Sequence, residues 1–243
     1  VHWTGHPITV LGVVDIDGTR LNIIGKTDGI SAMRQVSVDC NALSTTYVYE
    51  DMGVSLTLAF TSPLIPSDLY LLTRPVSYLE IRSRSIDGKK HNVSVKISVS
   101  EEVCMNRPGD DEAAYGQISL GRLNSVKMGR KNQQMLKRVG DDHRIEWGYF
   151  YLTSEGTTDV YKGEDGMTYV STELAVKGSA LVTFAYDDIA SIEYFHKPLR
   201  SYWNRDGALI TDEIIKALFE AGVEPFWRLG VTFENFTAIK GYH

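Results

Sequence analysis

Apolar and polar residues alternate with a period of two along much of the chain up to residue 187. In residues 93–100 the valines and the isoleucine occupy the odd positions, while serines and a lysine occupy the even ones. Residues 54–60, 170–176 and 182–186 repeat this pattern. A period of two with one apolar face is typical of half-buried antiparallel strands. We therefore predict about ten strands over residues 8–187, in a mainly β, antiparallel two-sheet β-sandwich similar to the super-sandwich architecture.

Turn signals separate the predicted strands. Aspartate-glycine dipeptides are typical of tight hairpins, because the central residues of such turns adopt positive φ angles. They occur at Asp17-Gly18, Asp87-Gly88 and Asp165-Gly166. Asp51-Met52-Gly53 predicts a slightly longer turn.

The last part of the chain carries a different pattern. We predict a short helix that begins at Thr211, which can cap it, and ends at Gly222. Its apolar residues fall on one stripe and need a partner: Ile214, Ile215, Leu218 and Ala221. The sequence thus divides into a predicted β-sandwich domain, residues 1–205, and a predicted helical segment, residues 206–243.

The net charge and the chain length exclude several classes of protein. The 243 residues include 25 Lys and Arg against 31 Asp and Glu, a formal net charge of −6. A mildly acidic chain argues against nucleic-acid binding, and the apolar runs are too short to predict a membrane span. Cys40 and Cys104 could pair, but two cysteines in a chain of this length are more often free thiols. Because Val1 is not a natural start, we expect a processed chain or an excised fragment.

The familiar catalytic motifs are missing from the sequence, and we predict neither a metal nor a cofactor. Asp187 and Asp188 form the best acidic pair, although adjacent residues of a strand face opposite ways. Residues 122–138 hold six basic residues and no acidic ones. We interpret this stretch as a solvated excursion whose charge is offset by Asp111 and its acidic neighbours.

Aromatic residues carry the stronger signal. Alternation in residues 146–152 places Trp147, Tyr149 and Tyr151 on one face of a strand, opposite Phe150 and Leu152. If the latter face is core, the three rings stand outside, where they form a domain interface or a platform for sugar rings; otherwise they are simply core themselves. Further aromatic residues follow the acidic pair and lead towards the predicted helix: Tyr194, Tyr202 and Trp203.

Several segments, taken in order, resemble the N-terminal β-rich region of the glutaminase A family of secreted bacterial and fungal proteins. They include Phe60–Asp68, Arg74–Leu79, Ile145–Tyr149 and Ala185–Asp188, and the shared order of the segments makes the match specific. The other matching segments are residues 2–5, 14–18, 35–39, 85–88, 140–142, 191–195 and 202–203. The resemblance covers about residues 2–220, whereas residues 222–243 do not resemble the continuation of the family.

The resemblance implies a larger, exported protein, periplasmic or extracellular, that hydrolyses L-glutamine to L-glutamate and ammonia. It also implies a C-terminal helical domain, outside this chain, similar to the helical barrels of many glycoside hydrolases. The family provides no motif that assigns a nucleophile within this region.

Three hypotheses remain open. The chain is a non-catalytic sandwich that packs on the helical domain and shapes its cleft, with a small amide or sugar as substrate. Alternatively, it is a carbohydrate-binding sandwich that uses Trp147, Tyr149 and Tyr151. Finally, it is an amidohydrolase in its own right, with Asp187 or Asp188 as the base and an unassigned serine or threonine as the nucleophile.

Overall fold

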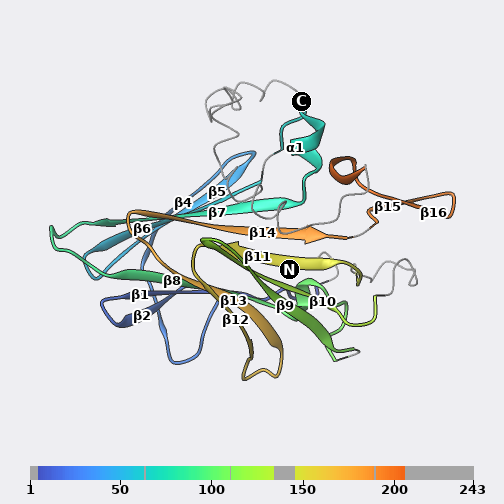
Figure 1. Ribbon diagram of the computed structural model, residues 1–243. Coiled ribbons are helices and arrows are strands. Elements are labelled where there is room, and N and C mark those ends of the chain that lie inside the picture. The colour runs from blue at the N-terminus through green and yellow to red at the C-terminus, as the bar shows by residue number, and fades with distance from the viewer. Residues whose placement is uncertain (1–4, 63, 110, 134–145, 189, 206–243) are drawn as a thin grey trace.

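The structure, a computed structural model, describes residues 5–62, 64–109, 111–133, 146–188 and 190–205. Within these ranges the chain forms two large β-sheets that stack face to face (Figure 1). The smaller sheet has the order β12–β13–β8–β1–β2–β3. Its strands are β12 (Thr157–Lys162), β13 (Thr168–Ala175), β8 (Val93–Ser100), β1 (Val10–Ile16), β2 (Thr19–Ile24) and β3 (Ser31–Ala32).

The larger sheet has the order β4–β5–β6–β7–β14–β11–β10–β9. Its strands are β4 (Gln35–Cys40), β5 (Ser44–Asp51), β6 (Val54–Thr61), β7 (Val76–Ser85), β14 (Ser179–Asp187), β11 (Tyr149–Ser154), β10 (Leu123–Arg130) and β9 (Ala113–Leu120). All strand pairs in both sheets are antiparallel except the short β2–β3 pair. The predicted antiparallel two-sheet sandwich is therefore confirmed.

The main core lies between the two sheets, and it is built by the residues that the alternation marked as apolar. Val54, Leu56 and Leu58 of β6 face Val95 and Ile97 of β8 across the sandwich, all of them almost completely buried. Burying a side chain of this kind stabilises the fold by roughly 1.5–3 kcal/mol. Because one face of each strand is buried, a slip of one residue would expose the whole set, so the strand register is strongly specified.

Three of the four predicted turns differ from the prediction. Asp17 and Gly18 have φ angles of 52° and 89° and form the expected two-residue turn between β1 and β2. Met52 and Gly53, at 49° and 77°, form a second such turn, shorter than predicted. Asp87-Gly88 and Asp165-Gly166 lie in longer loops, in which only the glycine has a positive φ.

Four short elements complete the described structure: α1 (Leu69–Thr73), η1 (Glu101–Val103), the hairpin of β15 (Ile192–Tyr194) with β16 (Lys197–Leu199), and η2 (Tyr202–Asn204). In Figure 1, α1 lies above β7 and β14, on the side away from the smaller sheet, and the β15–β16 hairpin projects from the same side. The helix predicted over residues 211–222 and the whole segment 206–243 lie outside the described residues, so this division of the chain stays a prediction.

Candidate functional site

A second apolar cluster covers the outer face of the larger sheet. Val76, Tyr151 and Ala185 form one row across β7, β14 and β11, because Ala185 pairs with both of the others in the strand register. Tyr78 extends the cluster along β7, and Trp203 of η2 packs against it. Figure 1 shows the coil of η2 beside α1, above this sheet. The outer face is therefore a buried surface here.

The aromatic residues singled out in the sequence divide into three environments. Tyr151 and Trp203 are buried, with 5% and 7% of their surface exposed. Trp147 and Tyr149 are half-buried: the Trp147 Nε1 donates a hydrogen bond to the Ala190 carbonyl oxygen at 3.1 Å, and Lys127 Nζ lies 5.0 Å from the centroid of the Tyr149 ring. The rings that alternation placed together thus do not form a continuous exposed platform for a sugar, because η2 covers part of their face.

The other two aromatic residues are exposed. Tyr194 and Tyr202 have 60% and 43% of their surface exposed. The Tyr194 ring packs edge-on against Phe195 at 4.6 Å between centroids, and the Arg205 guanidinium lies 4.2 Å from the centroid of Tyr202. These rings are available to a partner.

The sheet face that carries the second cluster also holds a buried cation. Arg74 lies between α1 and β7 and has only 9% of its surface exposed. Its Nη2 donates a hydrogen bond to the hydroxyl of Tyr78, which is fully buried. Burial raises the pKa of this phenol, and the adjacent guanidinium opposes that rise. Tyr78 therefore stays a neutral phenol beside a charged group.

The two candidate acids differ in position and in burial. Asp187 ends β14 and is buried, on the face that carries Tyr149, its partner in the strand register. Asp188 lies just beyond the strand, and its carboxylate accepts a hydrogen bond from the Ser191 hydroxyl at 2.7 Å. As predicted for adjacent residues, the two carboxylates occupy different environments.

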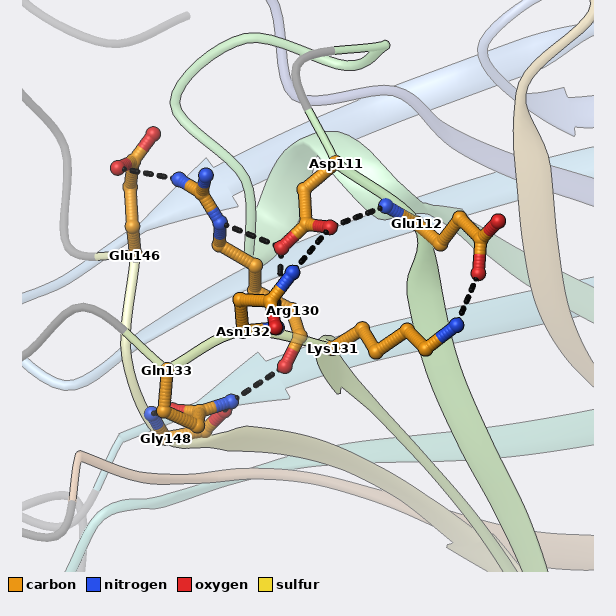
Figure 2. Close-up of polar contacts among 8 residues, drawn as sticks. All are labelled: Asp111, Glu112, Arg130, Lys131, Asn132, Gln133, Glu146 and Gly148. Atoms are coloured by element: carbon orange, nitrogen blue, oxygen red, sulfur yellow. Dashed lines mark hydrogen bonds and ion pairs between the residues drawn. The ribbon is translucent and has the colours of Figure 1, made fainter.

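A buried ion network supports the start of β11 (Figure 2). Arg130 Nε donates to Asp111 at 2.9 Å, and its Nη1 donates to Glu146 at 2.7 Å. Arg130 and Glu146 are 5% and 3% exposed. The interpretation of residues 122–138 as a solvated excursion was wrong at this point, because residues 123–130 form β10 and Arg130 enters the interior.

The network continues into the turn that precedes β11. Gln133 donates to the Arg130 carbonyl oxygen at 2.6 Å and accepts from the Gly148 N–H at 2.5 Å (Figure 2). Gly148 has a φ of 90°, and a Cβ there would lie 2.0 Å from the Asp187 carbonyl oxygen. Only glycine permits this approach. Arg130 thus helps to hold Trp147 and Tyr149 against the end of β14, through contacts between residues far apart in sequence.

With this geometry established, the comparisons with known proteins place the chain in a family. Residues 43–180 match a family described as a domain of unknown function, DUF5127. The chain belongs to the DUF5127 family. The matched residues run from just before β5 to the first residues of β14, so they include strands of both sheets as well as Arg74, Tyr78 and Tyr151, whereas β1 to β4 precede the match.

The sequence of the DUF5127 chain is also similar to that of a protein named glutaminase A. It is 25% identical to glutaminase A of Aspergillus oryzae (strain ATCC 42149 / RIB 40) over 175 residues. This region makes up 70% of the present chain but 23% of the relative, so the chain spans less than a quarter of that protein. The predicted kinship with glutaminase A is confirmed.

A further polar cluster of the DUF5127 chain was missed in the sequence. His91 lies between two carboxylates, with Nδ1 2.7 Å from Asp17 and Nε2 3.0 Å from Asp87. These contacts raise the pKa of His91, with Asp87 the larger cause, and the His91 hydrogen bond lowers the pKa of Asp87 to about 2. The Ser85 hydroxyl bonds to Asp87. Since both ring nitrogens are engaged by carboxylates, this geometry joins the β1–β2 turn to the β7–β8 connection between the two sheets, and it does not activate the serine.

The remaining predictions concern metals, membranes and thiols. Within the described ranges, no group of three or more His, Cys, Asp or Glu residues could hold a metal ion. None of the helices in that part of the chain is long and apolar enough to cross a membrane. Cys40 is exposed and Cys104 is buried, and both are free thiols. Burial raises the pKa of Cys104 to about 12, so this thiol is unreactive at neutral pH.

Proposed function

We propose that this chain is a non-catalytic β-sandwich domain of a larger glutaminase-related protein, where it packs on a helical domain and helps to shape its cleft. The substrate of that larger protein would be L-glutamine, as the name of the relative suggests. The proposal rests on how the exposed apolar side chains of the described residues are distributed.

Eight of the fourteen large exposed apolar residues in the described ranges fall in two short segments, which together we call the docking surface. Its members are Leu64, Leu69, Tyr70, Ile192, Tyr194, Phe195, Leu199 and Tyr202. The two segments meet, because α1 contacts η2, and in Figure 1 they lie on the same side of the larger sheet. Grouped exposed apolar residues mark interaction sites, whereas scattered ones do not.

The β15–β16 hairpin is the most exposed part of this surface. All residues of its two strands are exposed, and Phe195 at its tip has 80% of its surface exposed. Phe195 and His196 also have positive φ angles, 46° and 63°, which non-glycine residues adopt at a cost. A two-stranded hairpin is marginally stable alone in water, so its apolar tip is best explained by a partner that covers it.

The test compares ammonia release from glutamine by this chain and by the longer protein, with and without Tyr194→Asp. We expect activity only in the longer protein, and we expect Tyr194→Asp to reduce it by about fivefold or more, because a charge placed in an apolar interface weakens it by more than about 1 kcal/mol. Tyr115→Asp is the matched control, since Tyr115 has the same 60% exposure as Tyr194 but lies on β9.

Two results would overturn the proposal. Ammonia release by the 243-residue chain alone would make it an amidohydrolase, and Asp187 and Asp188 would be the first residues to vary. An equal effect of Tyr194→Asp and Tyr115→Asp would show that the docking surface has no special role. A location outside the cytoplasm stays a prediction based on the resemblance alone.

A further inference from the structure

Arg74 is a buried cation for which the described chain supplies no anion. Its guanidinium has one side-chain hydrogen bond among the described residues, from Nη2 to the Tyr78 hydroxyl. Its Nε is completely buried and has no acceptor. The described residues form no ion pair with it. Asp187 is buried at the end of β14, the strand that pairs with β7.

Other arginines of this protein show how a guanidinium group is ordinarily paired with carboxylates. Arg82 directs Nε and Nη2 at the two carboxylate oxygens of Glu80, at 2.8 and 2.9 Å. Arg130 directs Nε at Asp111 and Nη1 at Glu146. The guanidinium keeps its charge at all ordinary pH values, and its planar fork matches a carboxylate. A neutral phenol does not balance that charge, so the fold retains a buried group whose natural partner is absent from the described residues.

The position of Arg74 indicates where the anion comes from. Arg74 directly follows α1, whose Leu69 and Tyr70 belong to the docking surface. Tyr78, to which it is bonded, packs in the same cluster as Trp203 of η2. The buried cation therefore lies at the base of the surface on which we place the second domain, with apolar side chains around it that would exclude water once that domain is docked.

We propose that an aspartate or glutamate side chain of the docked domain binds Arg74. This inference rests on the proposed function, and it adds that the interface has one specific charged contact inside an apolar surround. The Nη1 and Nη2 groups of Arg74 donate the hydrogen bonds to the carboxylate, because Nε is already enclosed by this chain whereas Nη1 is not. Because Nη2 carries two hydrogens, the bond to Tyr78 is kept.

The first experiment uses the 243-residue chain and acetate, which has the carboxylate of an aspartate side chain. The probe is the Arg74 Nε–H signal in a ¹H–¹⁵N correlation spectrum, assigned by its loss in Arg74→Lys. At constant ionic strength we expect acetate to shift this signal in a saturable manner, while neutral acetamide and chloride do not. The Arg84 signal is the internal control, because Arg84 is exposed on the same strand, β7. The absence of a saturable shift, or an equal shift with acetamide, would overturn the carboxylate site.

The second experiment uses the longer protein and separates this inference from the docking proposal. We expect Arg74→Met to split the single calorimetric unfolding transition into two, because the sandwich and the helical domain lose their charged contact, while Arg84→Met unfolds as the wild type does. If Tyr194→Asp splits the transition and Arg74→Met does not, docking stands and the Arg74 contact is overturned. If neither variant does so, while acetate binds the chain alone, the docked domain is overturned as the source of the carboxylate.

Discussion

Two buried arginines lie on the larger sheet of this protein, and they differ in what surrounds them. Arg130, at the end of β10, is held by Asp111 and Glu146, and its backbone carbonyl accepts from Gln133. The side chain of Arg74, before β7, has one hydrogen bond among the described residues, to Tyr78, and its Nε has no acceptor there. The first cation is paired with two carboxylates of the sandwich itself, whereas the second has no carboxylate partner among the described residues.

The contrast also explains why one site positions residues and the other faces a partner. The Arg130 network fixes the turn at Gly148 and thereby the approach of β11 to the end of β14. Arg74 instead lies beside α1 and η2, where exposed apolar side chains gather.

Among the variants considered, Arg130→Met is expected to lower the free energy of unfolding the most. This change leaves the buried Glu146 without its cationic partner, and breaking a buried pair in this way costs about 3–5 kcal/mol. We expect the free energy of unfolding of the 243-residue chain to fall by that amount in urea titrations. A loss below about 1 kcal/mol would show that Arg130 is not the structural centre of its network.

A smaller loss is expected from Glu146→Gln, which keeps the shape of the side chain but removes its charge. Hydrogen bonds to charged groups contribute about 1.5–3 kcal/mol, and Arg130 would retain Asp111 in this variant. The Arg130 beside Asp111 holds the pKa of that carboxyl at about 2. We expect this lowered pKa to persist in Glu146→Gln, which carboxyl NMR signals recorded as a function of pH would show.

Arg74→Met sharpens the comparison because its expected effect on the isolated chain is close to zero. Removing a buried charge that has no counter-ion relieves a desolvation cost, and this gain offsets the lost hydrogen bond to Tyr78. We expect the free energy of unfolding to change by less than about 1 kcal/mol, or to rise. A loss as large as that of Arg130→Met would mean that Arg74 stabilises the sandwich itself, contrary to the distinction drawn between the two sites.

The smallest effect on stability is expected from a substitution of His91, because the charges around this residue lie close to solvent. The raised pKa of His91 means that its contribution is fully present below its usual pKa of about 6.5 and is lost as the pH rises through the raised value. The lowered pKa of Asp87 means that its contribution is present above about 3.9 and is lost as the pH falls through about 2. The contribution of this cluster is therefore greatest between about pH 4 and 6.5.

His91→Gln tests this pH dependence. We expect the melting temperature of the variant to lie furthest below that of the wild type within that window, and the difference to shrink at alkaline pH. Added salt should reduce the difference as well, since exposed ion pairs are screened. A difference that is constant from pH 4 to 9 would mean that His91 acts through packing and not through its charge.

Much of the fold could be predicted because its signal is local and periodic. The alternation in residues 149–152 correctly separated Phe150 and Leu152, which enter the main core, from Tyr149 and Tyr151, which face the other way. The turn lengths were less predictable, since Asp87-Gly88 and Asp165-Gly166 are compatible with both tight turns and longer loops. The kinship with glutaminase A was also recognisable, because ordered short segments survive where overall identity is 25%.

The candidate site depended on contacts between distant segments. Period-two alternation states which side chains share a face, but it does not state whether that face meets solvent, another sheet or a returning segment such as η2. For the same reason the sequence alone described Arg130 as one of several solvated basic residues, although Asp111 and Glu146 lie 19 and 16 positions away from it and enclose it.

The amino-acid sequence by itself determined the strands, the face to which each side chain belongs and the family, because all three depend on residue type and local order. Only the tertiary structure decided which of those faces are covered, which buried charges find partners and where the exposed apolar residues gather. Burial and charge pairing depend on the whole path of the chain. Arg74 and Arg130 are therefore the same residue type in sequence and two different sites in the folded protein.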